Sequence, residues 1–191
     1  MEAHQFAKTL IHTRQHISPK RLGLPGPNVS QISEILDAAG AAPDHGLTTP
    51  WHFYLLSDQK RAELGDVFAN NLISRDPSAS YEEINEARGK AFRAPLLILA
   101  TARLFNDENR IPTQEKMISA GCAIQNILLT AHSLGFGAGL SSGKALYSNE
   151  IKTLFNLPEK EEPLCFISIG TVTSHKNLRI RPTHKAYMTK I

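Results

Sequence analysis

Two short and almost continuously apolar runs, residues 96–101 and 164–170, most constrain what this chain can fold into. Such runs, bounded by proline, glycine or polar residues, are typical of buried strands. Between them, residues 114–134 have the apolar spacing of a buried helix, with these positions expected inside: Ala120, Gly121, Ala123, Ile124, Ile127, Leu128 and Ala131. The chain therefore needs a sheet that packs against at least one long helix.

The other regular segments are mostly helical. The spacing of Phe6, Leu10 and Ile11 predicts a helix over residues 3–13, and Ser30 is expected to cap a second helix that reaches Ala39. Further expected elements are a strand at 52–57, a helix at 58–75, an exposed charged helix at 80–93 and a helix near 147–155. Long helices with a few strands and no regular βαβ spacing favour an α+β fold, one central sheet flanked by helices. No repeat or linker divides the chain, so one domain over residues 1–191 is expected.

The composition is that of a globular protein, with 41% hydrophobic and 20% charged residues. No apolar run approaches the ~18 residues that a membrane span requires, and residues 1–8 lack the apolar core of a signal peptide. Cys122 and Cys165 lie in apolar segments without CxxC spacing, which favours buried thiols and a cytoplasmic location. The net charge of +3 is too small to demand a nucleic-acid partner.

Basic residues gather near both ends of the chain. Residues 163–191 contain no acidic side chain, and only Glu2 precedes Glu34 at the other end. The basic residues of the two ends are Lys8, Arg14, Lys20 and Arg21, and Lys176, Arg179, Arg181, Lys185 and Lys190. If the ends converge, they form a positive site suited to a phosphate; otherwise they are two solvated tails.

The connection at residues 42–53, APDHGLTTPWHF, has unusual chemistry for a link between a helix and a strand. Two prolines and a glycine restrict its backbone, and rigid loops that carry polar and aromatic side chains are common binding sites. His45 beside Asp44 could be a general base oriented by a carboxylate, a histidine that bonds a ring or a ribityl hydroxyl, or one satisfied by backbone. Trp51 is expected to pack in the core.

A glycine-rich turn is expected at residues 135–143, GFGAGLSSG. It does not match the dinucleotide fingerprint, because Leu140 occupies a required glycine position and a helix precedes it. It does contain G-x-S-x-G, which leaves open a serine hydrolase with Ser141 as nucleophile and His175 or His184 as base. The other interpretations are a ligand-facing loop, whose small residues let N–H groups and hydroxyls approach a ring or phosphate, and a plain turn. His12 and His16 have no third ligand nearby, so no metal site is expected.

Taken together, several segments resemble the FMN-dependent nitroreductase family, in particular its compact single-domain NAD(P)H nitroreductases. They are the region of Arg14, APDH…PWHF at 42–53, FRAP at 92–95, SAGCA at 119–123 and GFG at 135–137, and they follow the family's order. The resemblance implies an α+β homodimer with a mainly antiparallel sheet and FMN at the subunit interface. It also implies hydride transfer from NAD(P)H by a ping-pong cycle.

The resemblance further implies which residues contact FMN. Arg14, Gln15 and His16 fall on the family's Arg-Arg-Ser triplet near the FMN phosphate and ring. His45 falls on a flavin-contacting histidine of the neighbouring subunit. The stretch beside the flavin corresponds to Leu140, Ser141 and Ser142. Only Arg14 of the triplet is kept, and Ser141 replaces a basic residue. We therefore expect Lys20, Arg21, Arg179 or Arg181 to supply the missing phosphate charge.

Because FMN carries the reaction, no catalytic acid or base is expected from this chain. The sequence thus predicts an FMN-dependent NAD(P)H oxidoreductase that acts on small nitro compounds or quinones, with no nucleic-acid or membrane partner. A serine hydrolase built on Ser141 and a flavin-binding protein without turnover remain the alternatives.

Overall fold

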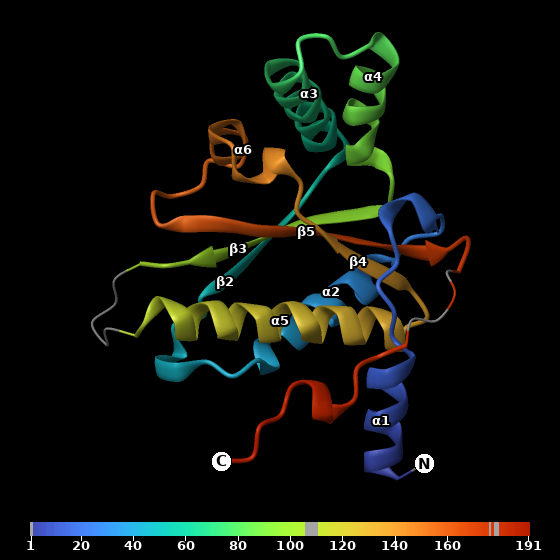
Figure 1. Ribbon diagram of the computed structural model, residues 1–191, viewed down its shortest axis with the longest axis vertical. Coiled ribbons are helices and arrows are strands. Elements are labelled where there is room, and N and C mark those ends of the chain that lie inside the picture. Colours follow the sequence, from blue (N-terminus) through green and yellow to red (C-terminus); the bar gives the residue numbers. More distant parts are fainter. Residues whose placement is uncertain (1, 106–110, 176, 178–179) are drawn as a thin grey trace.

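The fold is built on one antiparallel sheet of five strands (Figure 1). The computed structural model describes residues 2–105, 111–175, 177 and 180–191. The strands are β1 (Leu22–Gly23), β2 (Trp51–Leu55), β3 (Leu96–Arg103), β4 (Gly137–Ser141) and β5 (Glu161–Val172). β5 is central: it pairs with β3 on one edge and with β4 and then β1 along the other, while β2 pairs with β3.

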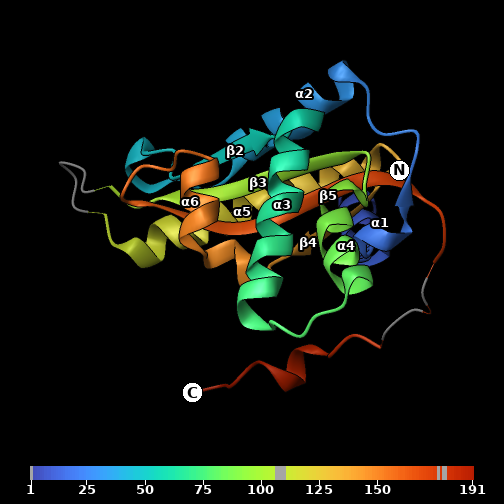
Figure 2. The ribbon, with the colours of Figure 1, turned by 90° about the horizontal axis from the view of Figure 1, so that it is seen from above.

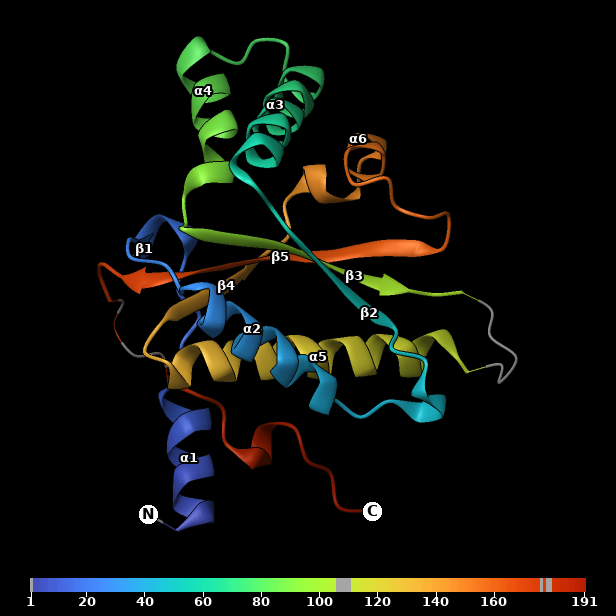
Figure 3. The same ribbon diagram turned by 180° about the vertical axis from the view of Figure 1, so that it is seen from behind.

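Helices cover both faces of the sheet. The α-helices are α1 (Ala3–Thr13), α2 (Val29–Asp37), α3 (Asp58–Arg75), α4 (Tyr81–Gly89), α5 (Thr113–Ser133) and α6 (Asn149–Leu154). α5 and α2 lie on one face, and α3, α4 and α6 lie on the other (Figure 3). α1 projects from the α5 side, where the two ends of the chain also lie (Figure 1).

The two faces explain why the strand sequences are continuously apolar. Ile98 and Ile167 pack in a core with α2 and α5, whereas Leu97, Leu99 and Phe166 pack in a second core with α3 and α6. Successive side chains of a strand point to opposite faces, so a strand covered on both sides needs apolar residues at every position. The α+β prediction is confirmed, including the mainly antiparallel sheet.

The element predictions held best for helices. The helices predicted at 3–13 and 58–75 have those bounds, but the cap of α2 is Asn28 and not Ser30. The side chains of Asn28 and Gln31 each accept the backbone N–H of the other, which closes a capping box at that point. Gly121 was expected inside and is exposed, because it lies away from the buried face of α5.

The glycine-rich turn is also corrected, since residues 137–141 form strand β4. The strand predicted at 52–57 begins and ends earlier, so that Trp51 is its first residue and is buried as expected. Within the described residues, no helix is long and apolar enough to cross a membrane.

Candidate functional site

The segment that follows α1 lies against β4 and brings two predicted parts of the site together. His16 pairs with Ala138 in a parallel bridge, and the Ile17 N–H donates to the Ala138 carbonyl at 2.9 Å. This close approach requires Gly139, because a Cβ there would collide with the Ile17 carbonyl. As a result, residues 14–16 lie beside residues 136–138, on the same strand that ends at Ser141.

The same pairing fixes which backbone groups of β4 remain available. Alternate residues of a strand direct their N–H and C=O groups to the same edge, so Leu140, like Ala138, directs its groups away from β5. Beyond the bridge at Ala138, no backbone partner for this edge is found in the part of the chain that the structure describes. The edge at Leu140 therefore offers an N–H donor to a ligand.

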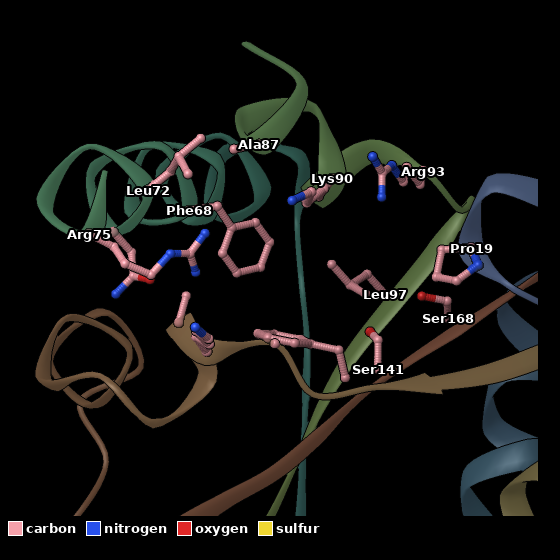
Figure 4. Close-up of a pocket in the computed structure, with 15 residues that line it drawn as sticks. Pro19, Phe68, Leu72, Arg75, Ala87, Lys90, Arg93, Leu97, Ser141 and Ser168 are labelled. Atoms are coloured by element: carbon pink, nitrogen blue, oxygen red, sulfur yellow. The ribbon is translucent and has the colours of Figure 1, made fainter. Parts of the chain in front are cut away.

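A cavity of about 240 Å³ lies between the sheet and the α3–α4 pair (Figure 4). Its apolar lining includes Phe68, Leu97 and Phe166, and Ser141 and Ser168 add hydroxyls. Four basic side chains also line it, and no acidic one does: Arg75, Lys90, Arg93 and Lys144. Such a cavity suits a flat, partly apolar ligand that carries or develops negative charge.

A second cavity, of about 180 Å³, lies where α1, the end of α5 and β4 meet, and Arg14, Gln15 and His132 line it. The Nε of Arg14 is buried without a hydrogen-bond partner. Burial, followed by the nearby Arg181 guanidinium, lowers the pKa of Arg14. Burial and then Arg14 lower the pKa of His132, whose Nε2 lies 2.8 Å from the Thr13 hydroxyl. This unbalanced positive charge suits an anion.

Arg14 and Arg181, one basic residue from each end of the chain, meet beside this second cavity. Arg181 donates from Nη2 to the Arg14 carbonyl at 2.5 Å. Lys20 instead forms an ion pair with Glu86 at 3.0 Å. The Nη1 atom of Arg21 is buried without a hydrogen-bond partner. The other two basic residues of interest, Lys176 and Arg179, lie outside the described residues.

His45 does not join the other predicted residues within one chain. It is exposed, and its Nδ1 lies 2.6 Å from a Glu115 carboxylate oxygen in the first turn of α5. His132 lies in the last turn, so a rise of about 1.5 Å per residue puts the two ends about 25 Å apart. Asp44 accepts the Thr49 N–H at 2.7 Å, and the carboxylate beside His45 is that of Glu115.

The sequence interpretation missed the basic lining of the first cavity. Phe68, Leu72 and Arg75 recur at helical spacing on α3 and line the cavity together. That spacing was visible, but nothing in the sequence linked α3 to Lys144, which follows β4. Distant residues that meet only through the sheet leave no local signal.

The family model for nitroreductases matches residues 25–171. The chain belongs to the nitroreductase family. It is 32% identical over 165 residues to the "Putative NAD(P)H nitroreductase" of Haemophilus influenzae, with 86% of this chain and 88% of that one covered. The matched residues include the loop at 42–53 and strands β2 to β4, so the match spans most of the architecture described above.

Solved structures share the fold of this nitroreductase-family chain. A nitroreductase-like family protein from Bacillus cereus superposes with a TM-score of 0.80 at 19% identity, over 100% of this chain and 98% of that one. The FMN-dependent nitroreductase NfnB from Mycobacterium smegmatis, solved in complex with NADPH, gives 0.74 at 14% identity, over 100% and 99%. The recognition of the family and the fold prediction are thereby confirmed, and the chain is placed among oxidoreductases.

The hydrolase alternative finds little support in this nitroreductase fold. Ser141 is half-buried and lines the first cavity, and no histidine or carboxylate is among the other residues that line this cavity. His175 lines the other cavity, and His184 is exposed in the last segment of the chain. A serine nucleophile needs a base within hydrogen-bond reach, and neither histidine shares the Ser141 cavity.

Proposed function

We propose that this protein is an FMN-dependent NAD(P)H oxidoreductase that reduces small nitro compounds or quinones. The observation that carries the proposal is the buried, unpartnered Nε of Arg14 beside a strand edge with a free N–H, in a member of the nitroreductase family. A phosphate and a flat ring with polar edges are the two parts of FMN that such groups would bind.

The residues present fit FMN. Arg14 and Arg181 are the proposed phosphate ligands, since they converge without an acidic partner among the described residues. The Leu140 N–H and the hydroxyls of Ser141 and Ser142 are proposed to contact the ring edge. Gln15 and His16, which follow Arg14 along β4, are proposed to contact the region between phosphate and ring.

When bound, FMN supplies two-electron transfer from NAD(P)H to an acceptor, with the two substrates using the same face in turn. For a quinone the balance is NAD(P)H + H⁺ + quinone giving NAD(P)⁺ + hydroquinone. For a nitro group, NAD(P)H and H⁺ convert it to nitroso, with release of NAD(P)⁺ and water.

The tasks left to this chain are binding, orientation and charge stabilisation. Lys90 and Arg93 line the cavity that Ser141 also lines, so they are placed to stabilise negative charge that develops there. The Leu140 N–H adds a donor at the strand edge. α3 and α4 roof the cavity and restrict water. No acid–base residue is required.

A homodimer with FMN at the interface completes the proposal. α5 exposes Met117, Ile118 and Gly121 on the side away from the sheet, and Ile118 is 65% exposed. Two copies that pack antiparallel along this face would bring His45 of one chain near Arg14 of the other, because His45 and Arg14 lie at opposite ends of α5. An apolar helix face with a glycine suits such packing.

The test is a visible spectrum of protein purified without added flavin, before and after anaerobic NADH or NADPH. Bands of oxidised flavin that bleach on addition of either nucleotide are expected, and the faster donor identifies the preferred one. Colourless protein that takes up no FMN would overturn the proposal. Yellow protein that does not bleach would instead indicate flavin binding without turnover.

A further inference from the structure

Three basic side chains around the first cavity form no close ion pair. In the described part of the chain, Arg75, Lys90 and Lys144 all line this cavity without a side-chain hydrogen bond or ion pair, although Asp76 and Glu86 lie near enough to attract Arg75 and Lys90 at longer range. Other basic residues nearby are paired: Arg93 lies 2.9 Å from Glu86, and Arg88 lies 2.8 Å from Asp66. Unpaired positive charge around a hollow without acidic residues attracts an anion.

Arg75 and Lys144 line the same cavity and come from two elements that are in contact. Arg75 and Leu72 lie at one end, and Arg93, Pro19 and Ser168 lie at the other (Figure 4). Lys144 begins a 3₁₀ turn, Lys144–Tyr147, that contacts α3, the helix that ends at Arg75. The same chain segment connects Lys144 to Ser141, which is proposed to contact the flavin. A ligand whose anionic group is bound by Arg75 and Lys144 could therefore extend to Ser141 and place its other end beside the flavin ring.

The walls define the rest of the ligand. Phe68 and Leu72 extend along α3 toward Arg75, so the part of the ligand between the anion and Ser141 is apolar and flat. A volume of about 240 Å³ lies below the range of drug-sized ligands and suits a single ring with short substituents. A dinucleotide is too large for it. A carboxylate on such a ring can pair with the planar guanidinium of Arg75 through two hydrogen bonds.

We propose that the electron acceptor of this protein is an aromatic carboxylate, whose carboxylate is bound by Arg75 and Lys144 and whose ring packs on Phe68 and Leu72. The proposal rests on the proposed function for the reduction itself. The proposed function leaves the charge of the acceptor open, and the present proposal makes it negative. The two positive regions then have separate roles. Arg14 and Arg181 bind the cofactor, whereas Arg75 and Lys144 bind the acceptor.

The experiment compares 4-nitrobenzoate with its methyl ester as acceptors, in the wild-type protein and in an Arg75→Gln/Lys144→Gln double variant. The wild type is expected to have the higher kcat/KM for the carboxylate. In the double variant the carboxylate-to-ester ratio of kcat/KM is expected to fall about tenfold, the sum expected for two partly exposed ion pairs. A Lys8→Gln/Lys190→Gln variant removes the same charge from exposed positions that line neither cavity, and its ratio should match the wild type.

A binding measurement keeps this test independent of turnover. Isothermal titration calorimetry with benzoate, and with neutral benzamide as the matched ligand, should show tighter binding of benzoate only while Arg75 and Lys144 are present. An unchanged kcat/KM ratio in the double variant overturns the proposal, and so does loss of bound flavin, because the two side chains would then serve the cofactor. If the protein proves colourless, the proposed function fails, whereas benzoate binding that depends on Arg75 and Lys144 would still support the anion site.

Discussion

At the scale of single residues, Arg14 is the side chain with the clearest unmet interaction. Its Nε is buried without a partner, and Arg181 lies close enough to lower its pKa, although burial lowers it more. An Arg14→Gln variant should bind FMN about tenfold more weakly, the loss of one charge-assisted hydrogen bond to phosphate. Quenching of FMN fluorescence by apoprotein measures this Kd. Arg88→Gln, whose parent side chain pairs with Asp66 away from both cavities, is the control and should bind as the wild type does.

Two histidines make stability depend on pH. Burial, followed by Arg103, lowers the pKa of His52 below 6.5, and burial followed by Arg14 does the same for His132. The unfolded chain therefore binds more protons as the pH falls below about 7, so the free energy of unfolding should decrease through and below pH 6.5. Urea midpoints at pH 7.5 and 5.5 measure the effect. A His52→Gln/His132→Gln variant should show a smaller difference between the two midpoints, and an equal difference would contradict this assignment.

At the scale of elements, the contact between the N-terminal segment and β4 depends on Gly139. In Gly139→Ala the added Cβ would collide with the Ile17 carbonyl, so the segment must move from the strand or the strand must distort. We expect a loss of about 2 kcal/mol in the free energy of unfolding, in the range for overpacking, together with weaker flavin retention. Gly40→Ala is the matched control, because nothing lies within 4 Å of its added Cβ, and it should change stability by no more than about 0.5 kcal/mol. Equal urea midpoints for the two variants would show that the contact is dispensable.

The same contact shows how far the sequence could predict the site. Helices 3–13 and 58–75 were predicted with their observed bounds, because apolar spacing within one segment determines them. β4 was expected as a turn, since Gly137, Ala138 and Gly139 have weak strand preference, and its strand conformation comes from pairing with β5. Family resemblance named the residues of the site near β4, and their contact with a flavin stays a prediction. Arg75 and Lys144 were not found, because only the tertiary fold brings them to one cavity.

At the scale of the whole molecule, one chain separates His45 from the remaining predicted flavin contacts by the length of α5. If His45 contacts FMN, one subunit therefore cannot supply all the predicted contacts to the same flavin. The exposed apolar face of α5 offers a way to complete it, because a two-fold axis across that face exchanges the ends of the two helices. The proposed dimer is therefore part of the site and also determines which residues belong to each flavin.

This sharing of residues can be tested by mixing two damaged chains. At an FMN concentration between the Kd of the wild type and the weaker Kd of the variants, we expect His45→Ala and Arg14→Gln proteins each to hold little flavin and to have low activity. In a mixed dimer, one site combines Arg14 of the His45→Ala chain with His45 of the Arg14→Gln chain and is intact, while the other site carries both changes. Co-expression with random pairing makes half of the dimers mixed and thus restores about a quarter of all sites. NAD(P)H oxidation per chain should rise to about that fraction of wild type. If His45 instead acts within its own chain, both sites of the mixed dimer are damaged, and activity should stay at the average of the two parent variants.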